Sequence, residues 1–269
     1  MSHRPRAPAC VAAVLVLASC HTGGSRVSPG QGDADAGVDA DGTLSPPRCL
    51  PPAGISGAPT SIAEVVALVN SLPRPVTLAC FLESLDRPLH ASAATSVFSL
   101  QPSVGRRSPR IFLFFGPVLG PVLGPVLGPL VISVVPDGHG AHTVECGQMV
   151  TDLHSVKGEV AFPVVADVTP ADPYDRVRDS AFETPQTICR GCHADESRHD
   201  AIDYADAFAS IALRPLPRAQ VTVDELLAER RSCDATLEPE RCAFLASLFD
   251  HGDVVPHPFP ENLRTFTSQ

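Results

Sequence analysis

The chain has no tryptophan, only two tyrosines among 269 residues, and a single lysine, Lys157. So few aromatic side chains argue against a surface that stacks nucleic-acid bases or sugar rings. The formal net charge is -10, and an acidic chain repels phosphate backbones, so we expect no nucleic-acid partner. A single lysine beside many arginines indicates a GC-rich genome rather than a chemical role for that residue. These absences leave membranes and proteins as the partners to consider.

Proline and cysteine are, by contrast, frequent. The 28 prolines predict short helices and strands joined by many loops. Nine cysteines suit an oxidising compartment better than a reducing cytosol. We expect Cys49 and Cys80 to close a disulfide over an intervening helix, and Cys233 and Cys242 to join two C-terminal helices, although spacing alone leaves the pairing open.

The first twenty residues have the composition of an export signal. Arg4 and Arg6 form a positively charged start, and residues 7–17 form an apolar stretch that is too short to span a bilayer. The segment Leu-Ala-Ser that ends at Cys20 resembles the lipobox of bacterial lipoproteins. The resemblance implies that residues 1–19 are removed and that Cys20 carries lipid at the mature N-terminus.

The lipid anchor defines the expected location of the protein. Lipid chains hold an exported protein to a membrane without a spanning helix, so the membrane is an expected partner. His21, rather than an acidic residue, follows Cys20; by resemblance to Gram-negative lipoproteins, this favours the outer membrane, facing the periplasm or the cell surface. An ordinary secretory signal with a chance cysteine is the alternative.

Composition divides the mature chain into several parts. Residues 20–48 are rich in Gly, Ser, Asp and Ala and predict a flexible acidic tether. We expect a β-rich domain with one N-terminal helix over 49–170, a small helical region over 171–260 and a tail over 261–269. The predicted fold class is therefore α+β, with a β-rich N-terminal part and a helical C-terminal part.

Hydrophobic patterns predict the individual elements. Apolar residues at helical spacing behind a capping box of Ser61 and Glu64 predict a helix over 61–72. A second capping box and a proline at a first-turn position predict two C-terminal helices, over 222–231 and 239–252. Runs of β-branched and apolar residues predict five strands, over 76–82, 95–100, 111–115, 130–135 and 160–165.

An uncharged stretch runs from Ile111 to Val135 and contains the tandem unit Gly-Pro-Val-Leu over 116–129. A proline at every fourth residue removes a backbone donor from each turn of a helix. In lipid, the orphaned carbonyls would be costly, so we do not interpret this stretch as a membrane span. We expect instead two buried strands with a tandem expansion at the turn between them.

The segment Cys189-Arg-Gly-Cys192-His193 has an identifiable chemistry, and in it the chain resembles c-type cytochromes. Two thiols three residues apart lie on one side of a helical turn and can add to the two vinyl groups of haem. The adjacent histidine then lies below the porphyrin plane. The resemblance implies one covalent haem, held by thioethers to Cys189 and Cys192, with His193 as the proximal iron ligand.

The chain departs from small soluble cytochromes c in its second iron ligand. No methionine follows the motif, because the only methionines are Met1 and Met149. Unless the iron is five-coordinate, the sixth ligand would come from one of four residues: His199, His251, His257 or Met149.

Three other interpretations of the cysteine pair stay open. A thioredoxin-like redox motif requires a βαβ unit, which the surrounding pattern does not predict. A zinc site could combine Cys189 and Cys192 with Cys233 and Cys242, although the second pair lacks knuckle spacing. The third interpretation is a plain structural disulfide network.

The sequence thus predicts a lipid-anchored protein whose haem transfers electrons, or which is an accessory subunit of a redox complex, with a redox protein as partner. No acid–base pair, nucleophile triad or phosphate-binding glycine loop is visible, so independent catalysis lacks support. The rival hypothesis is a non-enzymatic, disulfide-stabilised binding or structural lipoprotein without haem.

Overall fold

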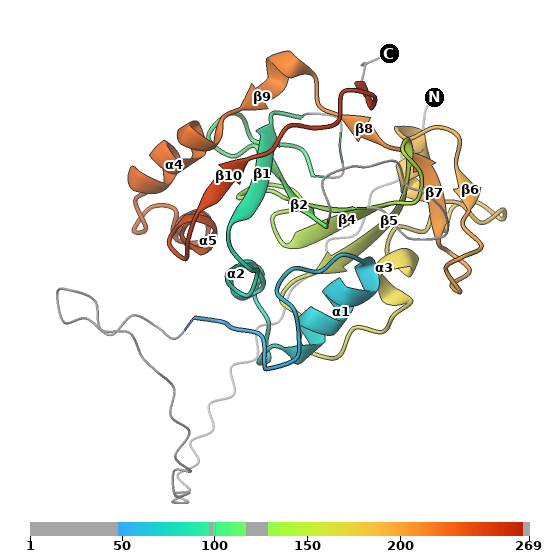
Figure 1. The fold of residues 1–269 in the computed structure, drawn as a ribbon, viewed down its shortest axis with the longest axis horizontal. Coiled ribbons are helices and arrows are strands. Elements are labelled where there is room, and N and C mark those ends of the chain that lie inside the picture. The colour runs from blue at the N-terminus through green and yellow to red at the C-terminus, as the bar shows by residue number, and fades with distance from the viewer. Residues whose placement is uncertain (1–47, 97–98, 100, 117–128, 266–269) are drawn as a thin grey trace, which may run out of the picture. The chain divides into compact units, whose positions relative to one another are not determined.

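The fold is built on a sheet of nine strands (Figure 1). The structure is a computed structural model and describes residues 48–96, 99, 101–116 and 129–265. The strand order is β10-β1-β2-β3-β4-β5-β7-β6, and β9 pairs with β1 outside this path. Strands β1 to β5 form an antiparallel meander, whereas β10 pairs with β1 in parallel. The strands are Leu89–Ala94 (β1), Arg110–Phe115 (β2), Leu130–Val134 (β3), Thr143–Met149 (β4), His154–Ala161 (β5), Ser197–Arg198 (β6), Phe208–Ile211 (β7), Gln220–Val221 (β9) and Val254–Pro256 (β10).

Helices and a small second sheet surround these strands. Helices α4 and α5 lie beside β1 and β10, and α1 and α3 lie near β4 and β5 (Figure 1). None of the described helices is long and apolar enough to cross a membrane. The helices are Ile62–Ser71 (α1), Leu78–Glu83 (α2), Asp172–Asp175 (α3), Val223–Arg231 (α4) and Pro239–Phe249 (α5), with 3-10 turns Ile188–Gly191 (η1) and Pro217–Ala219 (η2). Strands Leu213–Arg214 (β8) and Arg264–Thr265 (β11) form the second sheet.

The two faces of the main sheet differ, because side chains alternate along each strand. One face is apolar and packs against α1, α2, α4 and α5. Burial of each large aliphatic side chain there contributes about 1.5–3 kcal/mol before conformational entropy is subtracted. The opposite face carries charged, aromatic and small side chains and lines a cavity. The apolar face comprises Leu89, Ala91, Ala93, Ile111, Leu113, Leu130, Ile132, Val134, Val144, Val156 and Val160.

Several predicted elements are confirmed. Helix α1 occupies the predicted range, and the Ser61 hydroxyl accepts a hydrogen bond from the Glu64 backbone N–H at 3.1 Å. The capping box is only half formed, because the Glu64 carboxylate accepts from the Thr60 backbone N–H instead. The second predicted box, Thr222 with Glu225, is complete at the start of α4. Strands β2 and β3 and helix α5 also occur where they were predicted.

Other predicted elements are wrong. Only Val76 of the predicted strand 76–82 makes a β-bridge, and the Thr77 side chain then caps helix α2. The predicted strand 95–100 follows β1 rather than forming a strand, and residues 97, 98 and 100 lie outside the described part of the chain. The predicted strand 160–165 coincides only with the last residues of β5, which begins at His154. Short polar strands such as β4 were missed because their alternation is masked by small residues.

The predicted division at residue 170 into a β-rich and a helical part is wrong in that form. Strand β7 lies in the second part and pairs with β5 of the first. Strands β6, β9 and β10 also extend the same sheet. The class α+β describes the molecule, and residues 48–269 group as one unit. The signal, Cys20 and nearly all of the tether lie outside the described residues.

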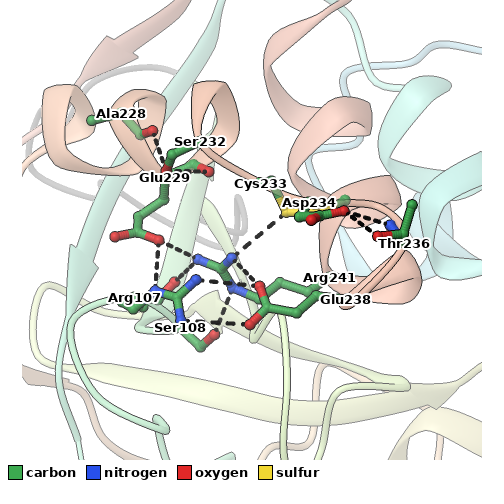
Figure 2. A network of polar contacts seen from close by, with 11 residues as sticks. Arg107, Ser108, Ala228, Glu229, Ser232, Cys233, Asp234, Thr236, Glu238 and Arg241 are labelled. Carbon is green, nitrogen blue, oxygen red and sulfur yellow. Dashed lines mark hydrogen bonds and ion pairs between the residues drawn. A yellow bond between two sulfur atoms is a disulfide. The ribbon is translucent and has the colours of Figure 1, made fainter.

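Both predicted disulfides are present. Cys49 bonds to Cys80, at α2, and Cys233 bonds to Cys242, which joins the segment after α4 to α5. A network of charges lies beside the second disulfide (Figure 2). At its centre the Arg241 side chain is only 5% exposed. Its guanidinium donates hydrogen bonds to Glu229 (2.7 Å), Glu238 (2.9 Å), the Ser108 hydroxyl (3.1 Å) and the Arg107 carbonyl (2.6 Å).

The network connects three segments that are distant in sequence. Arg107 and Ser108 belong to the loop before β2, whereas Glu229 lies on α4 and Arg241 on α5. A buried guanidinium is stable only when its donors are satisfied, and these partners supply four acceptors. The pair of C-terminal helices is thereby attached to the edge of the cavity-bearing sheet.

Candidate functional site

The Cys-x-x-Cys-His segment forms one helical turn on the wall of the cavity. The Thr187 hydroxyl caps η1 by accepting from the Cys189 backbone N–H at 3.2 Å. The backbone N–H groups of Cys192 and His193 both donate to the Cys189 carbonyl, at 3.0 and 2.8 Å. The Glu196 carboxylate accepts from the Thr187 backbone N–H at 2.8 Å. These bonds give the turn geometry that the sequence predicted, with both thiols and the imidazole at one wall.

The two cysteines of the motif are unpaired. Burial raises the pKa of the Cys189 thiol to about 11, and the charge of Lys157 opposes this shift. Cys189 is half-buried and Cys192 is exposed at the edge of the cavity. Cys146 is the other unpaired cysteine of the described residues, and burial raises its pKa to about 12. Cys189 and Cys192 are therefore thiols at the wall of the cavity, whereas Cys146 is buried in the core, beneath the floor that it helps to line.

The imidazole of His193 has a defined tautomer. Its Nδ1 lies 2.7 Å from the Ile211 carbonyl oxygen. A carbonyl can only accept, so Nδ1 carries the proton and donates. Burial lowers the pKa of His193 to about 3, and the charges of Lys157 and Arg110 add to the effect. The ring is therefore neutral at physiological pH, and Nε2 has a free lone pair, as in histidines that bind metals.

The cavity has a volume of about 680 Å³. This is within the range of about 300–1,000 Å³ that is typical of small-molecule and cofactor sites. Its floor is the polar and aromatic face of the sheet, from β1 to β5. Its walls come from three loops: 188–193, 212–219 and 257–263. The motif thus meets the cavity-bearing face of the sheet at the β5 and β7 side.

Small residues form a trough across the floor. Phe114, Val131, Gly147 and Lys157 are successive cross-strand partners on β2, β3, β4 and β5. A Cβ added to Gly147 would meet nothing closer than the Val131 carbonyl oxygen, at 3.8 Å. A side chain there would therefore project into the cavity without displacing the sheet. Between Phe114 and Lys157, this row of the floor has only the side chain of Val131. The strands that carry Phe114 and Lys157, β2 and β5, are about 14 Å apart, which is three strand spacings.

The only lysine of the chain lies on this floor. The Lys157 ammonium donates a hydrogen bond to the Ser155 hydroxyl, which also lines the cavity. Burial lowers the pKa of Lys157 to about 8, and the nearby charge of Arg110 acts in the same direction. From composition, the scarcity of lysine indicates only a GC-rich genome. The structure places Lys157, the one lysine, at the cavity.

An ion pair extends the polar part of the floor. Arg110 donates to Glu145 and also to the Ser133 hydroxyl, at 2.7 Å. Its Nε atom and the Oε1 atom of Glu145 are buried and have no hydrogen-bond partner among the described residues. Arg214 and Arg218 line the cavity beyond them. This end of the cavity is therefore polar and carries three arginines, Arg110, Arg214 and Arg218.

Aromatic rings line the side of the cavity opposite to His193. The His257 ring stacks on Phe114, with centroids 4.4 Å apart and planes at 12°. Phe259 meets Phe114 edge to face at 5.1 Å and Phe112 at 5.0 Å. His90 meets His257 at right angles, 5.8 Å away. Phe112, Phe114 and Phe259 together with His90 and His257 thus form an aromatic wall of the cavity.

The four candidate sixth ligands are distributed unequally. Met149 and His257 line the cavity, whereas His199 and His251 are not among its lining residues. The Nε2 atom of His251 instead lies 3.7 Å from Glu83 Oε1, at α2. The structure therefore brings two of the four candidates to the motif's cavity and leaves two elsewhere.

The alternative uses of the cysteine pair are not assembled in the described residues. Cys233 and Cys242 bond to each other, so the four-cysteine zinc site is wrong. No group of three His, Cys, Asp or Glu side chains within residues 48–265, as far as they are described, is placed to hold a metal ion. The motif lies on a turn of four residues rather than between a strand and a long helix, unlike a thioredoxin motif.

Sequence reasoning missed most of the cavity. Arg110, Phe112 and Phe114 alternate along β2, and Ser155 and Lys157 alternate along β5. A charged or aromatic residue at every second position is the signal of a sheet face that is neither core nor plain solvent. The predicted strand over 111–115 was a fully buried run, and the predicted strand over 160–165 began after Ser155 and Lys157. Neither prediction therefore contained the alternation of polar and apolar residues.

The residues that line the cavity fit a haem on three counts. Two unpaired thiols and a neutral imidazole with a free Nε2 lie together at one wall. The cavity volume of about 680 Å³ is in the range of cofactor sites, and Gly147 adds no side chain to its floor. The guanidinium groups of Arg214 and Arg218 line the cavity and are suited to carboxylates, which haem carries in its propionates.

Comparison with protein-family models, with curated proteins and with solved structures finds no match to this chain. Functional inference therefore depends on the chain's own residues and on the cavity that they form.

Proposed function

We propose that the chain is an exported, lipid-anchored protein that binds one haem covalently and transfers electrons. One observation carries the proposal. Two thiols that form no disulfide and an imidazole whose proton lies on Nδ1 occur together at the wall of a cavity of about 680 Å³. A disulfide between Cys189 and Cys192 would remove the thiols, and a protonated His193 would remove the iron ligand. Neither condition holds in the described structure.

Each residue of the motif has a distinct role in this proposal. Cys189 and Cys192 would hold the haem through two thioethers, each formed by addition of an S–H across a vinyl group, with sulfur on one carbon, the proton on its neighbour and no net oxidation. The Nε2 atom of His193 would bind the iron, and the Ile211 carbonyl holds the ring in place through Nδ1. Haem, when bound, supplies a one-electron redox couple. Arg214 and Arg218, which line the cavity, would hold the propionates.

Electron transfer is favoured over catalysis by the position of the thiols. Cys192 is exposed, so the edge of a ring attached there would lie close to the protein surface. A partner protein could therefore approach within a short distance of the redox centre. An accessory role in a larger redox complex uses the same geometry, with the partner as a permanent neighbour.

The lipid anchor and the haem support each other. Covalent attachment of haem occurs after export, and the lipobox-like segment that ends at Cys20 predicts export. A Cys20→Ser variant is expected to lose the lipid mass and to move from the membrane fraction to the soluble fraction. A variant that stays fully membrane-bound would contradict the lipid anchor and leave the haem proposal in place.

A pyridine haemochrome spectrum with intact mass tests the haem. The chain is expressed in a bacterial periplasm with a cytochrome c maturation system, beside the double variant Cys189→Ala/Cys192→Ala. The matched control is Cys146→Ala, which removes the third unpaired thiol but leaves the motif intact. We expect one covalent haem in the parent and in the control, and none in the double variant.

A colourless parent protein with two disulfides would overturn the proposal. In that case the cavity and its aromatic wall would support the other hypothesis, a non-enzymatic, disulfide-stabilised lipoprotein that binds a small apolar molecule. Colour that persists in the double variant would also contradict the assignment of the two thiols.

A further inference from the structure

Two histidines of the cavity have the same hydrogen-bond pattern. Nδ1 of His193 lies 2.7 Å from the Ile211 carbonyl oxygen, and Nδ1 of His257 lies 2.8 Å from the Pro258 carbonyl oxygen. Both carbonyls can only accept, so both rings carry their proton on Nδ1. Both Nε2 atoms are left with a lone pair and have no partner among the described residues. Histidines that bind metals are oriented by such a bond from the other ring nitrogen.

His257 is held in position by its surroundings. Its backbone N–H donates to the Ala91 carbonyl at 2.8 Å, which fixes the segment after β10 to β1. Its ring stacks on Phe114 at 4.4 Å and meets the edge of His90 at 5.8 Å. A stacked ring loses little further entropy when it binds a metal, because its orientation is already restricted.

The two imidazoles belong to opposite sides of the trough. His257 lies on Phe114 of β2, at one end of the row that continues through Val131 and Gly147 to Lys157. His193 is hydrogen-bonded to the carbonyl of Ile211 on β7, which pairs with His154 of β5, so His193 lies at the β5 end. The row spans about 14 Å. Val131 and Gly147 lie between its ends, and the Lys157 ammonium is 3.9 Å from the position that a Gly147 Cβ would take.

The other cavity residue among the candidates is enclosed by apolar neighbours. Met149 is only 6% exposed and packs with Ala212 and Leu263 in a small apolar cluster, against which Phe259 also packs. Its thioether is thus held inside this cluster, whereas the Nε2 atom of His257 makes no hydrogen bond among the described residues.

We propose that His257 is the second axial ligand of the haem, opposite His193. This inference rests on the proposed covalent haem and deepens it. Both axial positions are then occupied by side chains of the protein, so the iron has no open position for a substrate. Such a centre transfers electrons and does not bind small molecules at the metal.

Electron paramagnetic resonance of the ferric holoprotein tests the ligand. The parent is expected to be low-spin, and His257→Ala is expected to become high-spin and to bind carbon monoxide once reduced. Added imidazole is expected to return the variant to the low-spin state. The control is His251→Ala, which removes a histidine outside the cavity and is expected to remain low-spin.

A second variant keeps the test decisive if His257→Ala fails to fold. His257→Met replaces one ligand by another of similar length, and methionine ligation raises the reduction potential relative to two histidines. We expect a higher potential together with the charge-transfer band of a sulfur ligand. A low-spin His257→Ala, or a high-spin parent, would overturn the inference while leaving the covalent haem intact. A parent without covalent haem would instead overturn the proposed function.

Discussion

Replacing Lys157 by methionine is expected to stabilise the haem-free protein. The pKa of Lys157 falls from the ordinary 10.5 to about 8, mainly because burial disfavours the charged form. Each pKa unit corresponds to about 1.4 kcal/mol, so the charged lysine costs about 3 kcal/mol below pH 8. Methionine has a similar length and no charge, but it forfeits the hydrogen bond to Ser155, worth about 1 kcal/mol. The net gain in the free energy of unfolding is therefore about 2 kcal/mol at pH 7.

The pH dependence of this gain has a defined sign. Between pH 8 and 10.5 the unfolded chain keeps the lysine proton while the folded chain loses it, so the stability of the parent rises with pH in this window. The methionine variant lacks this pH-dependent contribution to the free energy of unfolding. Cys189 and Cys146 have raised pKa values and destabilise both proteins alike as the pH rises above 9. The advantage of the variant is thus largest below pH 8 and shrinks toward pH 10.5.

Urea denaturation of the mature chain at pH 7, 8.5 and 10 measures this difference directly. The protein is produced without a haem maturation system, so that only the empty cavity is compared. A methionine variant that is less stable than the parent at pH 7 would refute the reasoning. So would an advantage that does not change with pH, because Lys157 would then be paired with a carboxylate rather than desolvated.

Three further predictions concern the cavity and its supports. Gly147→Leu is expected to fold but to lose covalent haem. Gly147→Ala, whose Cβ meets no atom closer than 3.8 Å, is expected to retain most of the haem. Haem absorbance per mass of protein measures both. Arg241→Ala is expected to cost about 3 kcal/mol in urea denaturation, because two carboxylates and a carbonyl lose a buried partner; a loss below that of an ordinary surface substitution would contradict it. Removing the Cys49–Cys80 disulfide, which closes a loop of 31 residues, is expected to cost about 4 kcal/mol, against about 3 for the other disulfide with its separation of 9; equal costs would argue against loop entropy as the cause.

The sequence predicted the parts of the fold that local chemistry determines. Helix α1 and helix α4 are marked by side chains that cap their own first turn, so no distant residue is needed to recognise them. Strands β2 and β3 are apolar runs on either side of the tandem unit and were recognised for the same reason. Both disulfides were recognised because each pair brackets a helix or a turn.

What was missed depends on pairing between distant segments. The parallel pairing of β10 with β1 joins residues that are far apart in the chain, and it moves His257 next to Phe114. No local pattern at His257 signals this neighbour. The same holds for Lys157, whose position beside His193 arises only because β7 pairs with β5. The motif was therefore visible in the sequence, whereas the cavity around it was not.

The tandem Gly-Pro-Val-Leu unit has a consequence for how this protein can vary. Its two ends, Gly116 and Pro129, both line the cavity and lie side by side, with the Gly116 Cβ position 3.5 Å from the Pro129 Cα. The adjacent pair Phe115 and Leu130 fixes the register of β2 and β3 whatever lies between. Lengthening a closed loop from 12 to 16 residues costs only about 0.3 kcal/mol. A change in copy number is therefore expected to leave the pairing of β2 with β3, and with it the floor of the cavity, unchanged.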